Sequence, residues 1–267
     1  MSLTDKIRKL RDLLKFDNAL QLLLNRTFFG STSLTVYRYK GVTALVDHAL
    51  GDQDGVKSCL VPGLYDPFLE AMRPHLTVPV SFLDLGANTG GFPLTLLAHG
   101  LPIRKGVSVE LNPRTCTRLA VNLAQNGLSG SVQIVNAAIC GAGGELSVRL
   151  SEGSVSDSII FASDQGTEIT VKAVTIDEVI TRHFPTEGAI DMCKIDIEGA
   201  EYGVLDQPTH GLLRRCRWIV IEIHAVVGRS AAEVKNRLAE LGFEEALPAT
   251  RAVEDNVFLF RRAAETD

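Results

Sequence analysis

From residue 80 onward, short apolar runs alternate with stretches in helical spacing. The runs contain four to six residues and are mostly apolar, which is typical of parallel strands buried on both faces. They span residues 80–85, 105–109, 132–135, 192–197 and 218–223. Because helical stretches at 92–98 and 114–126 separate the first three runs, the pattern predicts an α/β fold with a mostly parallel sheet and helices on both faces.

The segments between the third and fourth runs are shorter and more polar. Residues 145–150, 158–162 and 168–173 predict a small meander, and residues 175–181 predict a helix. At the C-terminal end, a helix over 231–241 precedes two short strand-like segments at 243–245 and 256–260. We therefore expect an antiparallel hairpin to close the sheet.

The first 79 residues have a different pattern, with helical spacing over 3–24, alternation over 34–39 and a second helical stretch over 65–72. They predict a mainly helical extension, residues 1–79, in front of a larger domain, residues 80–267. One apolar helical face is formed by Ile7, Leu10, Leu13 and Leu14. We expect this face to pack on the protein itself rather than on a membrane surface.

Charge and cysteine content narrow the possible partners. The chain has a formal net charge of -5, which provides no general attraction for nucleic acid phosphates. Its five cysteines include no CxxC pair, and no apolar run approaches the roughly 20 residues needed to cross a membrane. We therefore expect a cytoplasmic protein with reduced thiols, without a nucleic acid partner and without stable membrane insertion.

A glycine-rich turn, FLDLGANTGGF at residues 82–92, follows the first apolar run. Such a turn lies at the carboxyl end of a strand, where ligands bind in open α/β sheets, although glycines also serve plain tight turns. Asn88 occupies the middle-glycine position of a dinucleotide fingerprint, and the G-K-[ST] of a P-loop is missing. Glu110 ends the next strand, twenty residues after Gly90, and an acid there can accept both hydroxyls of a ribose. These residues favour a nucleoside over a phosphate.

The strand ending in D-x-G-x-x-x-G, followed by a strand ending in glutamate, resembles class I S-adenosylmethionine-dependent methyltransferases. The resemblance implies a Rossmann-like seven-stranded sheet with an antiparallel C-terminal hairpin, and S-adenosylmethionine as cofactor with S-adenosylhomocysteine as product. It also implies that Asp84 lies near the amino acid part of the cofactor, that Glu110 binds the ribose, and that Asn112 and Asn136 border the adenine. The implied cofactor residues are Asp84, Gly86, Ala87, Asn88, Gly90, Glu110, Leu111, Asn112, Asn136, Ala137 and Asp196.

The fourth run continues into DMCKIDIEGAE, residues 191–201, where Asp196 and Glu198 are two positions apart. On an extended strand both would point to the same face at its carboxyl end. They can stabilise the cofactor's sulfonium, position a substrate hydroxyl or, with Asp84, hold a metal through oxygen ligands. Alternatively, Glu198 or Glu201 caps the helix that follows, because a helix N-terminus favours an acid.

The fifth run ends in Glu222 and His224. A carboxylate on a central strand needs a partner or an opening to a cleft, so we expect Glu222 to have one of these. An imidazole titrates near neutral pH, which makes His224 the preferred general base. The predicted catalytic residues are His224, Asp196, Glu198 and Glu222, and we assign no metal ligands from the sequence.

A set of motifs between residues 80 and 224 resembles the FkbM family of methyltransferases. In chain order they are LDLGANTGGF, VELNP, NAA, TID, KIDIEGAE and IEIH. The family resemblance implies O-methylation of hydroxyls on polyketides, sugars and other glycans. YKG at 39–41 and VDHALGD at 46–52 are similar to members from bacterial polysaccharide clusters. We therefore predict a sugar hydroxyl as acceptor, with residues 1–79 for substrate recognition and residues 80–267 as the cofactor-binding methyltransferase domain.

Other functions remain open at this point. The acceptor can instead be a polyketide or another small secondary metabolite. A NAD-dependent dehydrogenase shares the sheet and the second-strand acid, but the replaced middle glycine argues against it. A non-catalytic module of the same fold is disfavoured by the acids at the strand ends. We expect acceptor choice to depend on the chain up to Pro79 and on residues 151–165.

Overall fold

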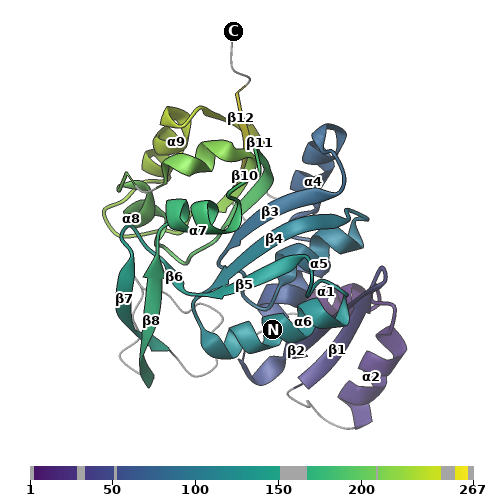
Figure 1. Ribbon diagram of the computed structural model, residues 1–267. Helices are drawn as coiled ribbons and strands as arrows, with labels where there is room; N and C mark the ends of the chain where they lie inside the picture. The colour runs from purple at the N-terminus through teal and green to yellow at the C-terminus, as the bar shows by residue number, and fades with distance from the viewer. Residues whose placement is uncertain are drawn as a thin grey trace.

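The computed structural model describes residues 3–28, 34–50, 53–150, 167–208, 210–247 and 256–263, and a seven-stranded sheet lies at its centre (Figure 1). Its spatial order is β11-β12-β10-β9-β3-β4-β5. The strands are β3 (Val80–Leu85), β4 (Ile103–Glu110), β5 (Val132–Asn136), β9 (Ile190–Ile195), β10 (Cys216–Glu222), β11 (Phe243–Leu247) and β12 (Val257–Arg262). Only β12 runs against the others, so the predicted parallel sheet with an antiparallel C-terminal hairpin is confirmed.

The strand order reverses direction between β3 and β9. The chain moves outward from β3 to β4 and β5, and then returns to the other side of β3 to form β9 and β10. In sheets of this kind, ligands bind outside the carboxyl ends of the strands at the point of reversal. The topology therefore predicts a site beside the ends of β3 and β9.

Helices cover both faces of the sheet, as the sequence predicts. On one face lie α5 (Gly91–Ala98) and α6 (Pro113–Gln125), and on the other lie α7 (Ile176–His183), α8 (Glu201–Leu205) and α9 (Ala231–Glu240). Neighbouring residues of β3 point in opposite directions, so Phe82 joins the first core cluster and Leu83 the second. Every residue of β3 is buried, which explains why its sequence lacks polar alternation.

A three-stranded sheet, in the order β6-β8-β7, extends beside the large one (Figure 1). Its strands are β6 (Ala138–Ile139), β7 (Gly144–Leu150) and β8 (Thr167–Val174). Two segments of the predicted meander form the antiparallel pair β7 and β8. The strand predicted at 158–162, and the loop 151–165 assigned to acceptor choice, lie outside the described residues.

The N-terminal region contains two helices and a hairpin, followed by short helical segments. These are α1 (Leu3–Leu13), α2 (Ala19–Phe28), β1 (Leu34–Tyr39), β2 (Val42–Asp47), η1 (His48–Leu50), η2 (Gln53–Lys57), α3 (Ser58–Leu60), α4 (Asp66–Met72) and η3 (Arg73–His75). Outside this region, one more short helical segment, η4 (Gly211–Arg215), precedes β10. The single helix expected over 3–24 is wrong, because the chain turns after Leu13. Phe16 packs against Tyr37 at 4.8 Å between ring centroids, and the Asn18 side chain hydrogen-bonds the backbone of Val36 and Arg38. These contacts with β1 outweigh the helical periodicity.

The apolar face expected to pack on the protein is buried only at Leu13. Ile7, Leu10 and Leu14 are 60%, 48% and 57% exposed, so the prediction is wrong for these three residues. The rest of the N-terminal region is firmly joined to the sheet domain, since residues of β2 and α4 belong to the same core cluster as Phe82. Among the described helices, none has the length and apolar character needed to cross a bilayer.

Candidate active site

A cleft opens at the carboxyl ends of β3, β4 and β9, where the topology places a ligand site. It holds about 650 Å³ of space free of protein atoms, with the open solvent at its mouth included. Six of the predicted cofactor residues line it: Gly86, Asn88, Glu110, Leu111, Ala137 and Asp196. Five other predicted residues, Asp84, Ala87, Gly90, Asn112 and Asn136, are not among its lining residues.

The turn from Gly86 to Gly90, here called the cofactor turn, requires unusual backbone angles. Gly86, Asn88 and Gly90 have φ values of +78°, +47° and +96°. A Cβ atom on Gly86 would lie 1.7 Å from the carbonyl oxygen of Asp196, so only glycine fits between the two loops. Asn88 replaces a glycine of the dinucleotide fingerprint but keeps the left-handed conformation, which asparagine tolerates better than most residues.

Glu110 is held at the mouth of the cleft by backbone donors. Its Oε2 accepts a hydrogen bond from the Asn88 N–H and its Oε1 from the Asn112 N–H, each at 2.8 Å. A carboxylate has about four acceptor positions, so these bonds orient the group and leave it able to accept from a diol. The turn and the end of β4 are thereby locked together around one carboxylate.

Asn112 and Asn136 shape the loops behind the cleft. The Asn112 Oδ1 accepts from the backbone of Arg114 at 2.9 Å and caps α6. The Asn136 amide donates to the carbonyls of Glu110 and Leu111. Both side chains therefore support residues that line the cleft, and direct contact with an adenine stays a prediction.

Lys194 is a site residue that the sequence analysis missed. It lies on β9, fully buried, with its Nζ 3.1 Å from Asp196 Oδ2 and 3.7 Å from Asp84 Oδ1, and it donates to the Gly86 carbonyl. Burial raises the pKa of Asp84 to about 6, although Lys194 opposes the shift. Burial alone would lower the pKa of Lys194, but Asp196 and Asp84 raise it well above its usual value. A lysine inside a strand buried on both faces needs such partners. The position of Lys194 within an apolar run was therefore the signal in the sequence that could have identified it.

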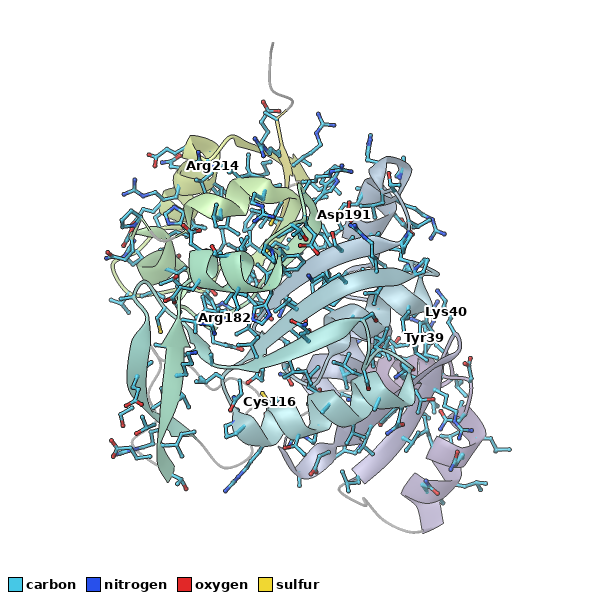
Figure 2. The ribbon with its side chains drawn as sticks, viewed as in Figure 1. Tyr39, Lys40, Cys116, Arg182, Asp191 and Arg214 are labelled. Atoms are coloured by element: carbon cyan, nitrogen blue, oxygen red, sulfur yellow. The ribbon has the colours of Figure 1, made fainter. Side chains whose placement is uncertain are left out.

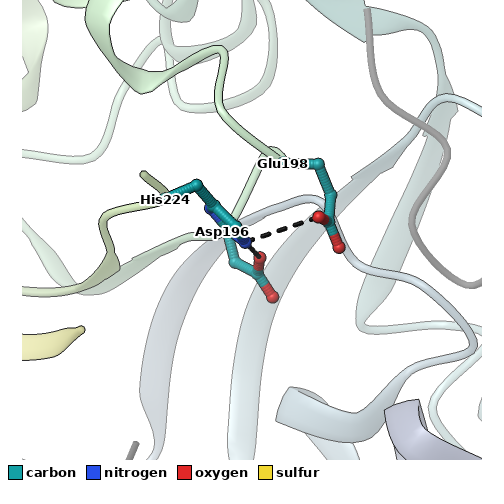
Figure 3. A group of neighbouring side chains, drawn as sticks. All are labelled: Asp196, Glu198 and His224. Atoms are coloured by element: carbon teal, nitrogen blue, oxygen red, sulfur yellow. Dashed lines mark ion pairs between the residues drawn. The ribbon is translucent and has the colours of Figure 1, made fainter. Parts of the chain in front are cut away.

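His224 lies just beyond β10 and is surrounded by acids (Figure 3). Its Nδ1 is 3.0 Å from Glu201 Oε1, and its Nε2 is 3.4 Å from Glu198 Oε2. The Nε2 also lies 3.5 Å from Glu222 Oε1 and 3.9 Å from Asp196 Oδ1. These five side chains, here called the acid–histidine cluster, bring together all four predicted catalytic residues.

The acids determine the protonation of His224. Burial lowers the pKa of His224, but the hydrogen bond and charge of Glu201, with the charges of Glu222 and Asp196, outweigh burial and raise it to about 9. Burial and the neighbouring Asp196 raise the pKa of Glu198 above its usual value. A pKa of about 9 favours the imidazolium form of His224 at neutral pH.

The route by which Asp196 and Glu198 reach His224 differs from the prediction. β9 ends at Ile195, so the two acids do not share a face of an extended strand. They lie in a turn in which Glu198 has a φ of +54°, and the turn directs both of them toward His224. Local chain reversal, rather than strand alternation, assembles the pair.

Glu201, which the sequence left open, is a fully buried support for the cluster. Its Oε1 accepts from the backbone of Ile197 and Gly199 at 3.2 and 3.3 Å, close to the start of α8. The same oxygen contacts His224 Nδ1, so Glu201 holds the preceding turn and orients the imidazole. The helix cap that the sequence left open for Glu198 or Glu201 is not formed, because α8 has no side-chain cap hydrogen bond. Glu222 has the partner predicted for it, because Asn256 Nδ2 donates to its Oε1 at 3.0 Å.

One protein-family model matches the part of the chain that contains most of this site. The family model of the methyltransferase FkbM domain matches residues 84–245, whereas no curated protein sequence matches the chain. TrmK from M. capricolum, solved with S-adenosyl-homocysteine, is 8% identical, with 73% of this chain and 67% of that chain covered and a TM-score of 0.42. Precorrin-6y C5,15-methyltransferase from Geobacter metallireducens GS-15 is 15% identical, with 73% and 84% covered and a TM-score of 0.39. Ribosomal protein L11 methylase from Lactobacillus delbrueckii subsp. bulgaricus is 14% identical, with 73% and 77% covered and a TM-score of 0.37.

Proposed function

The chain belongs to the FkbM methyltransferase family, and from that premise we propose that it methylates a hydroxyl of a sugar in a bacterial glycan or polysaccharide. It is an S-adenosylmethionine-dependent methyltransferase, and S-adenosylhomocysteine is its product. The matched range, residues 84–245, contains both the cofactor turn and the acid–histidine cluster. The sugar acceptor and the O-methyl product are the proposed part.

The residues of the cleft fit this cofactor. Glu110 presents an oriented carboxylate suited to a ribose diol, and Gly86, which lines the cleft, lets the cofactor turn pack closely against the Asp196 backbone. Leu111 and Ala137 add apolar lining suited to the adenine ring. When bound, S-adenosylmethionine supplies an electrophilic methyl group on a cationic sulfur, which Asp196 at the edge of the cleft would stabilise.

The observation that carries the proposed acceptor site is the acid–histidine cluster next to the cleft. Asp196 and Glu198 line the cleft and also contact His224, which supports an approach of the acceptor hydroxyl from the side of the cluster. In the transfer, the hydroxyl oxygen forms a bond to the methyl carbon as the carbon–sulfur bond breaks, and the electron pair remains on sulfur. Holding these atoms in line can contribute about 7 to 11 kcal/mol to lowering the barrier.

The hydroxyl proton passes to the acid–histidine cluster. Because a pKa of about 9 favours protonated His224 at neutral pH, a carboxylate of the cluster is the better acceptor, and His224 orients it. Base catalysis of this type contributes about 10²- to 10⁴-fold. We expect His224→Ala to reduce turnover and leave cofactor affinity nearly unchanged. Equal loss of turnover and of cofactor affinity would contradict a role for His224 in handling the acceptor.

The N-terminal region is proposed to recognise the acceptor. It reaches the cofactor turn, since a Cβ on Gly55 would lie 3.1 Å from the Asn88 side chain, and Cys59 packs beside Gly91. The similarity of residues 39–41 and 46–52 to polysaccharide-cluster members supports a glycan. The acidic net charge gives nucleic acid no electrostatic advantage.

Two measurements test the proposal. Calorimetry should detect binding of S-adenosylmethionine and none of NAD, and binding of NAD alone would contradict the cofactor assignment. Release of S-adenosylhomocysteine should then be followed with oligosaccharides, macrolide-type polyketides and short RNA as separate acceptors. Turnover with oligosaccharides alone supports the sugar acceptor, and turnover only with polyketides or RNA would overturn it.

A further inference from the structure

The spacing of groups around His224 Nε2 is unusual for hydrogen bonds. The oxygens of Glu198, Glu222 and Asp196 lie 3.4, 3.5 and 3.9 Å away, beyond the usual N–H···O distance of about 2.9 Å. Ligand atoms about 2.1 Å from one ion, at angles of about 90° to 110°, lie about 3.0 to 3.4 Å from each other. The Glu198 oxygen lies at this spacing from the nitrogen, the Glu222 oxygen is just outside it, and the Asp196 oxygen would have to move closer by about 0.5 Å to share an ion.

We propose that Asp196, Glu198 and His224 bind a divalent metal ion at the acceptor side of the cleft. Each offers one ligand atom, and these atoms all lie within 4.8 Å of one another (Figure 3). Asp196 and Glu198 also line the cofactor cleft, so an ion there would lie beside the proposed methyl-transfer point. The residues come from two loops, after β9 and after β10, which the sheet order places side by side.

The contact on the other ring nitrogen, within the same cluster, is of the kind that accompanies metal-binding histidines. Histidines that bind metals almost always donate their second ring N–H to a carboxylate, a carbonyl or water, which fixes the ring orientation. Glu201 provides this contact to Nδ1 at 3.0 Å, and backbone donors from Ile197 and Gly199 hold Glu201 itself. Glu201 is completely buried, so its carboxylate serves the ring and not solvent.

The excess of negative charge in this region also favours binding of a cation. Four carboxylates of the acid–histidine cluster contact His224, and the nearby Lys194 is shared with Asp84. Even with His224 protonated, the negative groups outnumber the positive ones. A divalent ion at Nε2 would replace the proton there and balance the carboxylates.

The donor set indicates which ion would bind. Carboxylates suit Mg²⁺, Ca²⁺ and Mn²⁺, and an imidazole favours first-row transition metals, so the combination points to Mn²⁺ or Zn²⁺. Asp84, considered as a metal ligand from the sequence, instead lies beside Lys194 and outside the set. Three protein ligands leave positions open for substrate oxygens.

The chemical use of the ion rests on the proposed function. Adjacent hydroxyls of a sugar would occupy the open positions, and the ion would lower the pKa of the bound hydroxyl. The hydroxyl proton would pass to Glu222, the oxygen would bond to the methyl carbon, and the carbon–sulfur bond would break. The metal site would therefore select acceptors with a vicinal diol over those with a single hydroxyl.

The test measures metal binding without methyl transfer. The full chain, stripped with a chelator, is titrated with Mn²⁺ alone, and free Mn²⁺ is followed by its electron paramagnetic resonance signal. We expect one site per chain, with affinity weakened about tenfold or more in Glu198→Gln and His224→Gln. Glu240→Gln, an exposed acid on α9, is the matched control and should bind as the wild type does.

A spectroscopic measurement separates this site from adventitious binding. Pulsed paramagnetic resonance should detect nitrogen coupling to the bound Mn²⁺, and the coupling should be lost in His224→Gln. Absence of stoichiometric binding of both Mn²⁺ and Zn²⁺, or binding that both variants retain, would overturn the proposal. Circular dichroism and S-adenosylmethionine calorimetry on the same samples check folding and cofactor binding, so failure of the metal site is distinguishable from failure of the proposed function.

Discussion

The acidic side chains in the two halves of the cleft have different partners. On the β3 and β4 side, Glu110 is fixed between two backbone N–H groups, and Asp84 lies beside Lys194. On the β9 and β10 side, four carboxylates contact one imidazole. The first half, proposed to bind the nucleoside, has its acids paired, whereas the second retains negative charge that a proton, a substrate or a cation has to balance.

Asp191 shows that burial of an acid does not by itself mark a functional site. It lies on β9 at the opposite end of the strand from Asp196 (Figure 2). Its Oδ2 accepts from both the backbone and the hydroxyl of Ser81, and Arg104 and Arg217 lie 3.8 and 3.6 Å from its oxygens. This acid is balanced by the fold, so the surplus of acids, rather than their burial, distinguishes the acceptor half.

The largest expected effect comes from Lys194, which joins the two halves. Lys194→Met leaves Asp84 buried without its cation, and we expect the free energy of unfolding to fall by about 3 to 5 kcal/mol. Lys105→Met, which removes a partly exposed pair with Glu187, should cost less than about 1 kcal/mol. Urea unfolding of both variants measures the difference, and equal losses would show that Lys194 is not the structural link.

The next effect is a dependence of stability on pH caused by Asp84. Its folded pKa of about 6 lies above the unfolded value of 3.8, so the folded state holds the proton more tightly. Relative to Asp84→Asn, the wild type should lose up to about 3 kcal/mol as pH rises from about 4 to above about 6. Urea unfolding across this range tests the sign, and parallel curves for the two proteins would contradict the shift.

A third comparison concerns the contact between the two halves at Gly86. Gly86→Ala places a Cβ against the Asp196 carbonyl, while Gly100→Ala has the same kind of positive φ and no atom within 4 Å. Both carry backbone strain, so the difference isolates the collision. We expect Gly86→Ala to lose about 1 to 3 kcal/mol more, measured by thermal unfolding. Equal losses would mean that the two loops are free to separate.

The smallest effect separates helix capping from cofactor contact at Asn112. Asn112→Ala and Ser230→Ala each remove an N-cap, of α6 and α9, and each should cost about 1 kcal/mol. Because the Asn112 side chain is not among the lining residues, its loss should weaken S-adenosylmethionine binding by less than about threefold, well under 1.4 kcal/mol. A tenfold or greater loss in Asn112→Ala alone would instead establish the direct contact predicted from the sequence.

Local patterns predicted most of the sheet and the cofactor turn. β3 and β9 are buried on both faces, so their apolar runs identify them, and glycines with positive φ mark the turn at Gly86 and Gly90. The break after Leu13 was not predictable in this way, because Phe16 packs against Tyr37, which is far from it in the sequence.

The missed site residues depend on distances between strands. Lys194 acts on Asp84 and Asp196 because β9 lies beside β3, and Glu201 meets His224 only when the loops after β9 and β10 are adjacent. Neither pairing has a fixed spacing in the chain. A charged residue within a fully buried strand is nevertheless a usable signal, and it applied to Lys194.

Binding of S-adenosylmethionine to three proteins, measured by calorimetry, tests the division into two halves most directly. The wild type should bind one equivalent, Glu110→Gln should bind about 10- to 100-fold more weakly, and Glu198→Gln should remain near the wild-type affinity. Glu110 lies in the proposed cofactor half and Glu198 in the proposed acceptor half, so this asymmetry is expected. Unchanged affinity in Glu110→Gln together with a large loss in Glu198→Gln would contradict it.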